Sequence, residues 1–192
     1  TQTGDEVRCL RGDREQIYSV AFAPNGEWLV SGGLDGTLHI CRVSDGALLR
    51  TIQNHSLIQY SVACSPDSRI IASGTSANLV LNGAFQVPKR KLEGHTGRVL
   101  AASLAGAHFA ITSSEDGTVR VWDAGTGDQM ALLELPFEAT LSSFRDVGDM
   151  WLMSTRYRDS GVLVSADTLD FFPFACGAHN GRAARTNRTN YT

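Results

Sequence analysis

The sequence predicts an all-β protein built from four successive copies of a four-stranded unit. Three observations support this prediction. Segments of the chain resemble the first copy at offsets of about 42, 81 and 123 residues. Each well-formed copy contains short apolar runs separated by turn residues, and no stretch shows convincing helical periodicity. The 19 glycines and only 5 prolines fit many short strands joined by tight turns.

The first copy shows the pattern most completely. Its turn sequences are Pro24-Asn25-Gly26, Asp35-Gly36 and Ser44-Asp45-Gly46, and the apolar runs between and around them span 18–23, 28–31, 37–43 and 48–52. Asp-Gly between two such runs is a strong hairpin signal, because the turn requires a positive φ. Four strands in a period of about 40–45 residues are typical of a β-propeller blade.

The other copies place the remaining blades. The second contains SVACSPDSRIIASG from Ser61, the third contains AITSSEDGTVRVWD from Ala110, and the fourth contains the fainter match MWLMSTRYRDSGVLV from Met150. We therefore expect a repeat domain over residues 1–176, with blades at about 13–52, 55–92, 95–135 and 138–175. Residues 3–11 are expected to form the outer strand of a preceding or closing blade, and residues 177–192 a basic tail.

The third copy, LEGHTGRVLAASLAGAHFAITSSEDGTVRVWDAGTG, resembles a WD repeat almost throughout. Gly94-His95 stands at the Gly-His position of that family and Trp122-Asp123 at its Trp-Asp position. The resemblance implies a WD-type propeller with a buried network of His95, Thr112, Asp116 and Trp122. Such polar groups are costly to bury alone and acceptable when each one finds a partner.

The first copy departs from the WD pattern at two positions. Asp13 stands where the family has its histidine, and Cys41-Arg42 replaces Trp-Asp. Ser31 and Asp35 keep the hydroxyl and hairpin-carboxylate positions. The resemblance therefore implies a weaker network in this blade.

The second copy departs further, and the fourth keeps little beyond its strand pattern. His55 and Ser73 can be placed in the second copy, but Ala77 replaces the hairpin aspartate and Gly83 falls at the tryptophan position. We expect His55 and Ser73 to keep part of a network there.

No constellation in the sequence predicts catalysis. His95, Thr112 and Asp116 could be read as a hydrolase triad, but the network of the fold explains the same spacing. His39, His108 and His179 are isolated and are expected to be solvated loop side chains. No set of ligands has the spacing of a metal site, and no phosphate-binding motif is present. We expect no catalytic residue, no metal and no cofactor.

The resemblance implies a protein-interaction scaffold that acts as a subunit or domain of a multiprotein assembly. Two alternatives stay open: a regulatory propeller module of a larger enzyme, and an RNA-associated subunit that uses the basic tail. The net charge of −3 favours neither nucleic acid nor membrane. The candidate partner contacts are Trp28 if it is exposed, Arg42, Arg98, the cluster Lys89, Arg90 and Lys91, and the tail arginines Arg182, Arg185 and Arg188.

The remaining expectations concern compartment and completeness. The 4 cysteines are widely spaced, which favours free thiols in the cytoplasm or another reducing compartment. No apolar run approaches the roughly 20 residues needed to cross a membrane. Seven blades would need roughly 290 residues. We therefore expect an open, partial propeller of about four blades, whose edges are capped by another chain, a second copy or further sequence.

Overall fold

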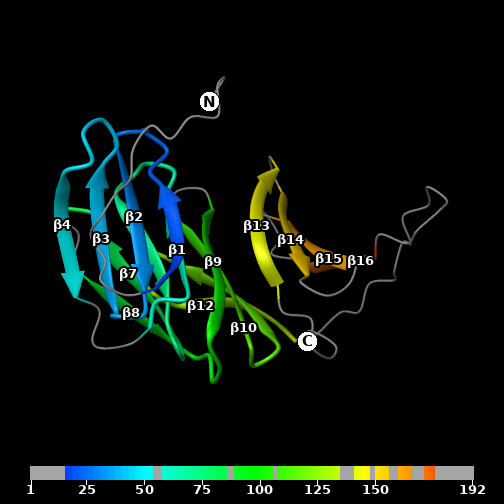
Figure 1. Cartoon of the computed structure of the whole chain (residues 1–192). Coiled ribbons are helices and arrows are strands. Elements are labelled where there is room, and N and C mark those ends of the chain that lie inside the picture. The colour runs from blue at the N-terminus through cyan, green and yellow to red at the C-terminus, as the bar shows by residue number, and fades with distance from the viewer. Residues whose placement is uncertain are drawn as a thin grey trace.

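The computed structural model describes residues 16–53, 58–85, 89–105 and 108–134 in full, together with the backbone of four further strands between 141 and 175 (Figure 1). The described residues contain no helix and form four antiparallel sheets of four strands each, always in chain order along the sheet. The all-β propeller predicted from the repeats is therefore confirmed.

The sheets are the four blades. The first comprises β1 (Ile17–Phe22), β2 (Trp28–Gly33), β3 (Thr37–Arg42) and β4 (Leu48–Gln53). The second comprises β5 (Ser61–Cys64), β6 (Ile70–Gly74), β7 (Asn78–Gly83) and β8 (Arg90–Glu93). The third comprises β9 (Val99–Ala105), β10 (Phe109–Ser114), β11 (Thr118–Asp123) and β12 (Gln129–Glu134). The fourth comprises β13 (Leu141–Val147), β14 (Met150–Thr155), β15 (Ser160–Ser165) and β16 (Phe171–Ala175).

The Asp-Gly turns close the central hairpins of the first and third blades. Gly36 and Gly117 have φ values of 75° and 79°, a region that glycine adopts without steric cost. The preceding aspartates accept a hydrogen bond from the backbone N–H two residues later: Thr37 N–H to Asp35 and Thr118 N–H to Asp116, both at 2.9 Å. Sequence and turn geometry therefore agree.

The apolar core lies between the blades. Val30, Leu38 and Ile40 of the first blade pack against Val62 and Ile71 of the second. A second cluster joins the second and third blades and includes Leu79, Leu81, Ala110 and Trp122. Because fully burying one large aliphatic side chain contributes about 1.5–3 kcal/mol, packing between neighbouring blades stabilises each sheet.

The inner strands neighbour one another in the order β1, β5, β9 and β13. Backbone hydrogen bonds link these blades, from Gln59 N–H to the Gly33 carbonyl and from Val99 N–H to the Thr75 carbonyl, both at 2.9 Å. We call the end of the blades where β1, β5 and β9 begin the tyrosine face, because it carries Tyr18 and Tyr60. The end where β3 and β11 finish is the opposite face.

Candidate functional site

The third blade joins His95, Thr112, Asp116 and Trp122 in one chain of hydrogen bonds. His95 Nδ1 lies 2.9 Å from Asp116 Oδ2, and His95 Nε2 lies 2.8 Å from Thr112 Oγ1. Trp122 Nε1–H donates to the same Thr112 oxygen at 2.9 Å. Since the carboxylate accepts from Nδ1–H, the Thr112 hydroxyl is left to donate to Nε2. The chain connects β10, β11 and the segment that precedes β9.

The electrostatics of this network favour a neutral imidazole beside an ionised carboxylate. Burial lowers the pKa of His95 below its usual 6.5 and outweighs the neighbouring Asp116, which raises it. Burial alone would raise the pKa of Asp116. Hydrogen bonds from Thr118, the Thr96 N–H and His95 together lower that pKa to about 2.

The geometry of these side chains indicates that they hold the strands of the third blade together. Thr112 is fully buried, and the His95 and Asp116 side chains are almost entirely so. Thr118 Oγ1 also donates to Asp116 Oδ1 at 2.7 Å. The hydrogen-bonding groups are directed at one another rather than at a cavity, which is the arrangement that removes the cost of burying them.

The first blade contains a related chain of hydrogen bonds that was not predicted from the sequence. Thr37 Oγ1 donates to Asp35 Oδ2 at 2.8 Å and lies 3.3 Å from His39 Nδ1. His39 is a buried residue in the middle of β3, so the expectation of a solvated loop histidine is wrong. The signal was its place inside the apolar run 37–43, which contains a strand covered on both sides, so that the successive residues Leu38 to Cys41 are all buried. Ser31 is also buried and pairs with His39 across β2 and β3.

The described residues of the second blade contain part of such a network. Ser73 donates to the Val80 carbonyl at 3.3 Å and lies 3.4 Å from Asn82 Nδ2. The strand register places Asn82, and not Gly83, at the position of Trp122, because Asn82 pairs with Ile71 as Trp122 pairs with Ala110. The earlier assignment of Gly83 is therefore wrong.

The reason for that misassignment is the length of the β6–β7 turn. Ser73 and Asn82 are nine positions apart in the sequence, whereas Thr112 and Trp122 are ten positions apart. The turn around Ala77 is one residue shorter, so it has no position for a hairpin aspartate. Asp13 and His55, the histidine-position candidates of the first two blades, lie outside the described residues.

The candidate partner contacts do not form one surface. Trp28 is only 2% exposed and packs in the core with its ring 6.1 Å from that of Phe85, so it is not a surface contact. Arg42 pairs with Asp45 at 2.6 Å on the opposite face. Arg98 lies on the tyrosine face, immediately before β9. Arg42 and Arg98 are therefore at opposite ends of the blades.

The basic cluster is largely used within the protein. Arg90 donates to the Gly125 carbonyl of the third blade, and Lys91 pairs with Glu93 at 2.6 Å. Arg50, at the equivalent position of β4, donates to the Gly83 and Ala84 carbonyls of the second blade at 3.2 and 3.0 Å. Lys89 is exposed. The tail residues Arg182, Arg185 and Arg188 lie outside the described residues.

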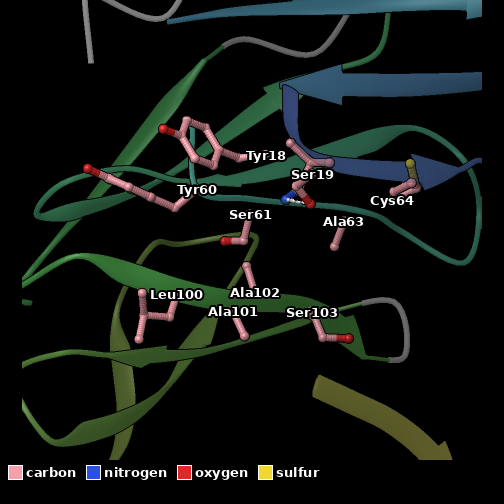
Figure 2. A pocket seen from close by; sticks show the side chains of 12 residues that line it. Tyr18, Ser19, Tyr60, Ser61, Ala63, Cys64, Leu100, Ala101, Ala102 and Ser103 are labelled. Carbon is pink, nitrogen blue, oxygen red and sulfur yellow. Dashed lines mark hydrogen bonds between the residues drawn. The ribbon is translucent and has the colours of Figure 1, made fainter. Parts of the chain in front are cut away.

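An open hollow of about 430 Å³ lies along the inner strands β1, β5 and β9 (Figure 2). Small side chains from the three strands form most of its wall, including Ser19, Ala63 and Ala101, and Tyr18 and Tyr60 border it. The two tyrosine rings are 5.9 Å apart, and the Arg98 guanidinium lies 5.5 Å from the centre of the Tyr60 ring. Arg98 is a candidate from the sequence and the two tyrosines are not, because the proximity of these side chains depends on how the blades pack.

Four-stranded blades, inter-blade cores and the buried histidine–hydroxyl–indole network define a β-propeller protein with repeated blades. The family model described as "WD domain, G-beta repeat" matches residues 4–41, 46–80 and 86–123. The chain belongs to the WD-repeat family.

Curated relatives and solved structures agree with this assignment. The chain is 34% identical over 119 residues to Pre-mRNA-processing factor 19 homolog 2 of Arabidopsis thaliana, covering 59% of this chain and 22% of that protein. It is 38% identical over 111 residues to Target of rapamycin complex subunit wat1 of Schizosaccharomyces pombe, covering 55% of this chain and 35% of the relative. The structure of U3-55K aligns with a TM-score of 0.78 at 18% identity, over 88% of this chain and 54% of that one.

The chain therefore spans about a third or less of the length of these two curated relatives. Among the described residues, no three His, Cys, Asp or Glu side chains gather as a metal site would require. The described residues also contain no helix with the length and apolar character needed to cross a membrane.

Proposed function

We propose that this chain is a non-catalytic scaffold that binds other protein chains within a larger assembly. The observation that carries the proposal is that one group of polar side chains bonds the strands together inside a blade, while another group lies at the strand ends. Those of the third-blade network bond strands to one another inside the blade. At the strand ends, by contrast, Tyr18 and Arg98 are exposed and lie beside the half-buried Tyr60.

The names of the relatives support the same function. One is a subunit of the target of rapamycin complex, and another is a pre-mRNA-processing factor. A blade array offers a rigid surface drawn from several repeats, which suits the assembly of other proteins. The fold contributes this support by analogy.

The test is the composition of the native particle. The protein is tagged in its source and purified at physiological salt, and light scattering measures the mass of the particle that elutes from a sizing column. We expect a stoichiometric set of other chains, identified by mass spectrometry. A particle that contains this protein alone would contradict the scaffold. A co-purifying enzyme whose rate changes when this protein is removed would favour the regulatory module instead.

A second surface suited to contact with another chain is the exposed side of β1. Val20 and Phe22 are 52% and 64% exposed. The residues at equivalent register positions, Val62 and Cys64 in β5, pack against the first blade. We propose that a second copy of the chain or a partner covers this side of β1.

RNA association is a second candidate function. The segment 177–192 contains Arg182, Arg185 and Arg188 and no acidic residue. The relatives' names include pre-mRNA processing and, for crb3/ipi3 of Schizosaccharomyces pombe, pre-rRNA processing. Filter binding with single-stranded RNA at low and high salt tests it, since phosphate contacts weaken steeply with salt. Binding that survives removal of residues 177–192 would contradict the assignment to the tail.

A further inference from the structure

We propose that the tyrosine face binds a partner peptide through an acidic side chain flanked by an apolar residue. Arg98 binds the carboxylate, and the rings of Tyr18 and Tyr60 receive the apolar neighbour. This inference rests on the proposed scaffold function and specifies the chemistry of the partner at one surface.

Three blades contribute to the surface. Tyr18 lies near the start of β1, Tyr60 immediately before β5, and Arg98 immediately before β9. Ring centres 5.9 Å apart and a guanidinium 5.5 Å from the Tyr60 centre make a continuous row. Aromatic rings beside an arginine are typical of residues that dominate binding energy in protein interfaces.

The present partner of Arg98 holds it weakly. The contact joins Arg98 Nε to Glu115 Oε2 at 3.4 Å, and the two side chains are 54% and 40% exposed. Within the described part of the chain, Glu115 is the only acid that pairs with Arg98. An exposed pair of this kind contributes little, whereas a guanidinium can bind a carboxylate through two parallel N–H donors. A partner carboxylate can therefore bind Arg98 without first breaking a strong internal bond.

The hollow beside Tyr18, Tyr60 and Arg98 determines which kind of residue can flank the acidic side chain of the partner peptide. Its wall combines the small side chains of Ala63, Ala101 and Ala102 with serine hydroxyls, and none of the described residues that line it is charged (Figure 2). Two of those hydroxyls already have partners: Ser19 Oγ accepts from the Val62 N–H, and Ser61 Oγ donates to the Val99 carbonyl. A second charge entering the hollow would lose water without gaining a partner. An apolar side chain fits this environment better.

The same surface indicates that the bound group of the partner peptide is an anion and not a cation. A cationic ligand would have to reach Glu115 against the repulsion of Arg98. The neighbouring carboxylate Asp116 is already occupied by His95, Thr96 and Thr118. An anionic group is attracted by Arg98 and can also accept a hydrogen bond from the Tyr60 hydroxyl, whereas the Tyr18 hydroxyl donates to Gln16 Oε1 at 3.4 Å.

The experiment measures retention of four fluorescent pools of degenerate ten-residue peptides on the immobilised full chain. The peptides are alike except at one central position flanked by leucine or valine, which is Glu, Gln, Lys or phosphoserine. We expect the Glu pool to be retained about tenfold more than the Gln pool, the effect of one charge-assisted hydrogen-bonded pair. Equal retention of the Glu and Gln pools overturns the proposal, as does preference for the Lys pool. Preference for the phosphoserine pool replaces the carboxylate with a phosphate as the bound group and overturns the assignment.

Single substitutions test whether the peptides bind at the tyrosine face. Arg98→Gln should reduce retention of the Glu pool about tenfold, and Tyr60→Leu should also reduce it. Glu115→Gln should increase retention, because it removes the competing carboxylate. Arg42→Gln is the matched control, since Arg42 also pairs with an acid but lies on the opposite face. An equal loss in Arg42→Gln and Arg98→Gln, or a loss in Glu115→Gln, contradicts the proposal. Thermal melting of each variant shows whether it is folded.

The two proposals fail in distinguishable ways. If the native particle contains stoichiometric partners but the Glu pool shows no preference, the scaffold stands and the acidic peptide is rejected. If the protein purifies alone, the scaffold is rejected whatever the peptides show. Loss of RNA binding in Arg98→Gln without any effect on peptides would assign this face to RNA and overturn the inference.

Discussion

At the scale of single residues, the third blade depends on a polar chain in which each member satisfies another. Asp116 accepts hydrogen bonds from the His95 ring, the Thr96 N–H and the Thr118 hydroxyl. Thr112 bridges the imidazole and the indole. In such a chain, removing one member leaves a buried donor without an acceptor, which costs more than the bond itself contributed.

We expect Asp116→Ala to lower the free energy of unfolding by about 1–3 kcal/mol, because it leaves the His95 and Thr118 donors unpaired. Urea denaturation measures the loss. Asp128→Ala is the control, since Asp128 is exposed in a turn of the same blade, and its effect should be within about 0.5 kcal/mol. Similar losses for the two variants would show that Asp116 has no special role.

The same network predicts a dependence of stability on pH. Because burial lowers the pKa of His95 in the folded chain, the unfolded chain takes up the proton first as pH falls. The contribution of His95 should be complete above about pH 6.5 and should be lost as pH falls toward its folded-state pKa. Asp116 adds a further loss below about pH 4, since its folded pKa is about 2.

Urea denaturation at pH 7.5 and pH 5.5 tests this prediction. The wild type should lose more stability between these values than His95→Gln, whose side chain does not titrate. Parallel losses in the two proteins would mean that other groups cause the pH dependence.

At the scale of the elements, close approach of neighbouring blades restricts side-chain size. Gly74 ends β6 beside the start of β9 in the next blade. A Cβ added at Gly74 would lie 2.7 Å from the Val99 carbonyl oxygen, closer than real Cβ contacts. Since Val99 also donates its N–H to the Thr75 carbonyl, the two backbones cannot separate without losing a bond between blades.

We therefore expect Gly74→Ala to destabilise the chain by about 1–3 kcal/mol, the usual cost of overpacking. The midpoint of thermal unfolding followed by circular dichroism measures the loss. The comparison is Gly125→Ala, where the added carbon would meet the movable side-chain oxygen of Asp123 at 3.1 Å. If Gly125→Ala costs as much as Gly74→Ala, the inter-blade clash is not the cause.

At the scale of the whole molecule, four of the large apolar side chains that are exposed among the described residues lie on one strand. Ile17, Tyr18, Val20 and Phe22 are all exposed and all belong to β1, whereas the inner strand of the second blade is covered by its neighbours. Several exposed apolar residues along one strand are typical of an interaction surface.

We expect the isolated chain to self-associate through β1. Sedimentation velocity over a range of concentrations should show oligomers, and the double variant Val20→Thr, Phe22→Ser should shift the distribution toward the monomer. Leu132→Ser is the control, since Leu132 is exposed on β12 of the third blade. Oligomers that persist in the double variant, or a monomeric wild type, would contradict this use of β1.

The repeat, the strands and the turns could be predicted from the sequence, because these features depend on local patterns. Asp35-Gly36 and Asp116-Gly117 favour hairpin turns whatever the surrounding fold. The four residues of the third-blade network all lie within one repeat of the sequence. Features that depend on contacts between blades or on strand register could not be predicted in this way and are evident from the folded chain. In the structure, Asn82 and not Gly83 stands at the tryptophan position, and Trp28 and His39 are buried. Arg42 and Arg98 lie on opposite faces. Tyr18, Tyr60 and Arg98 lie side by side on one face. Tyr18, Tyr60 and Arg98 are about 40 positions apart in the sequence and belong to three blades, so no local pattern could place them side by side.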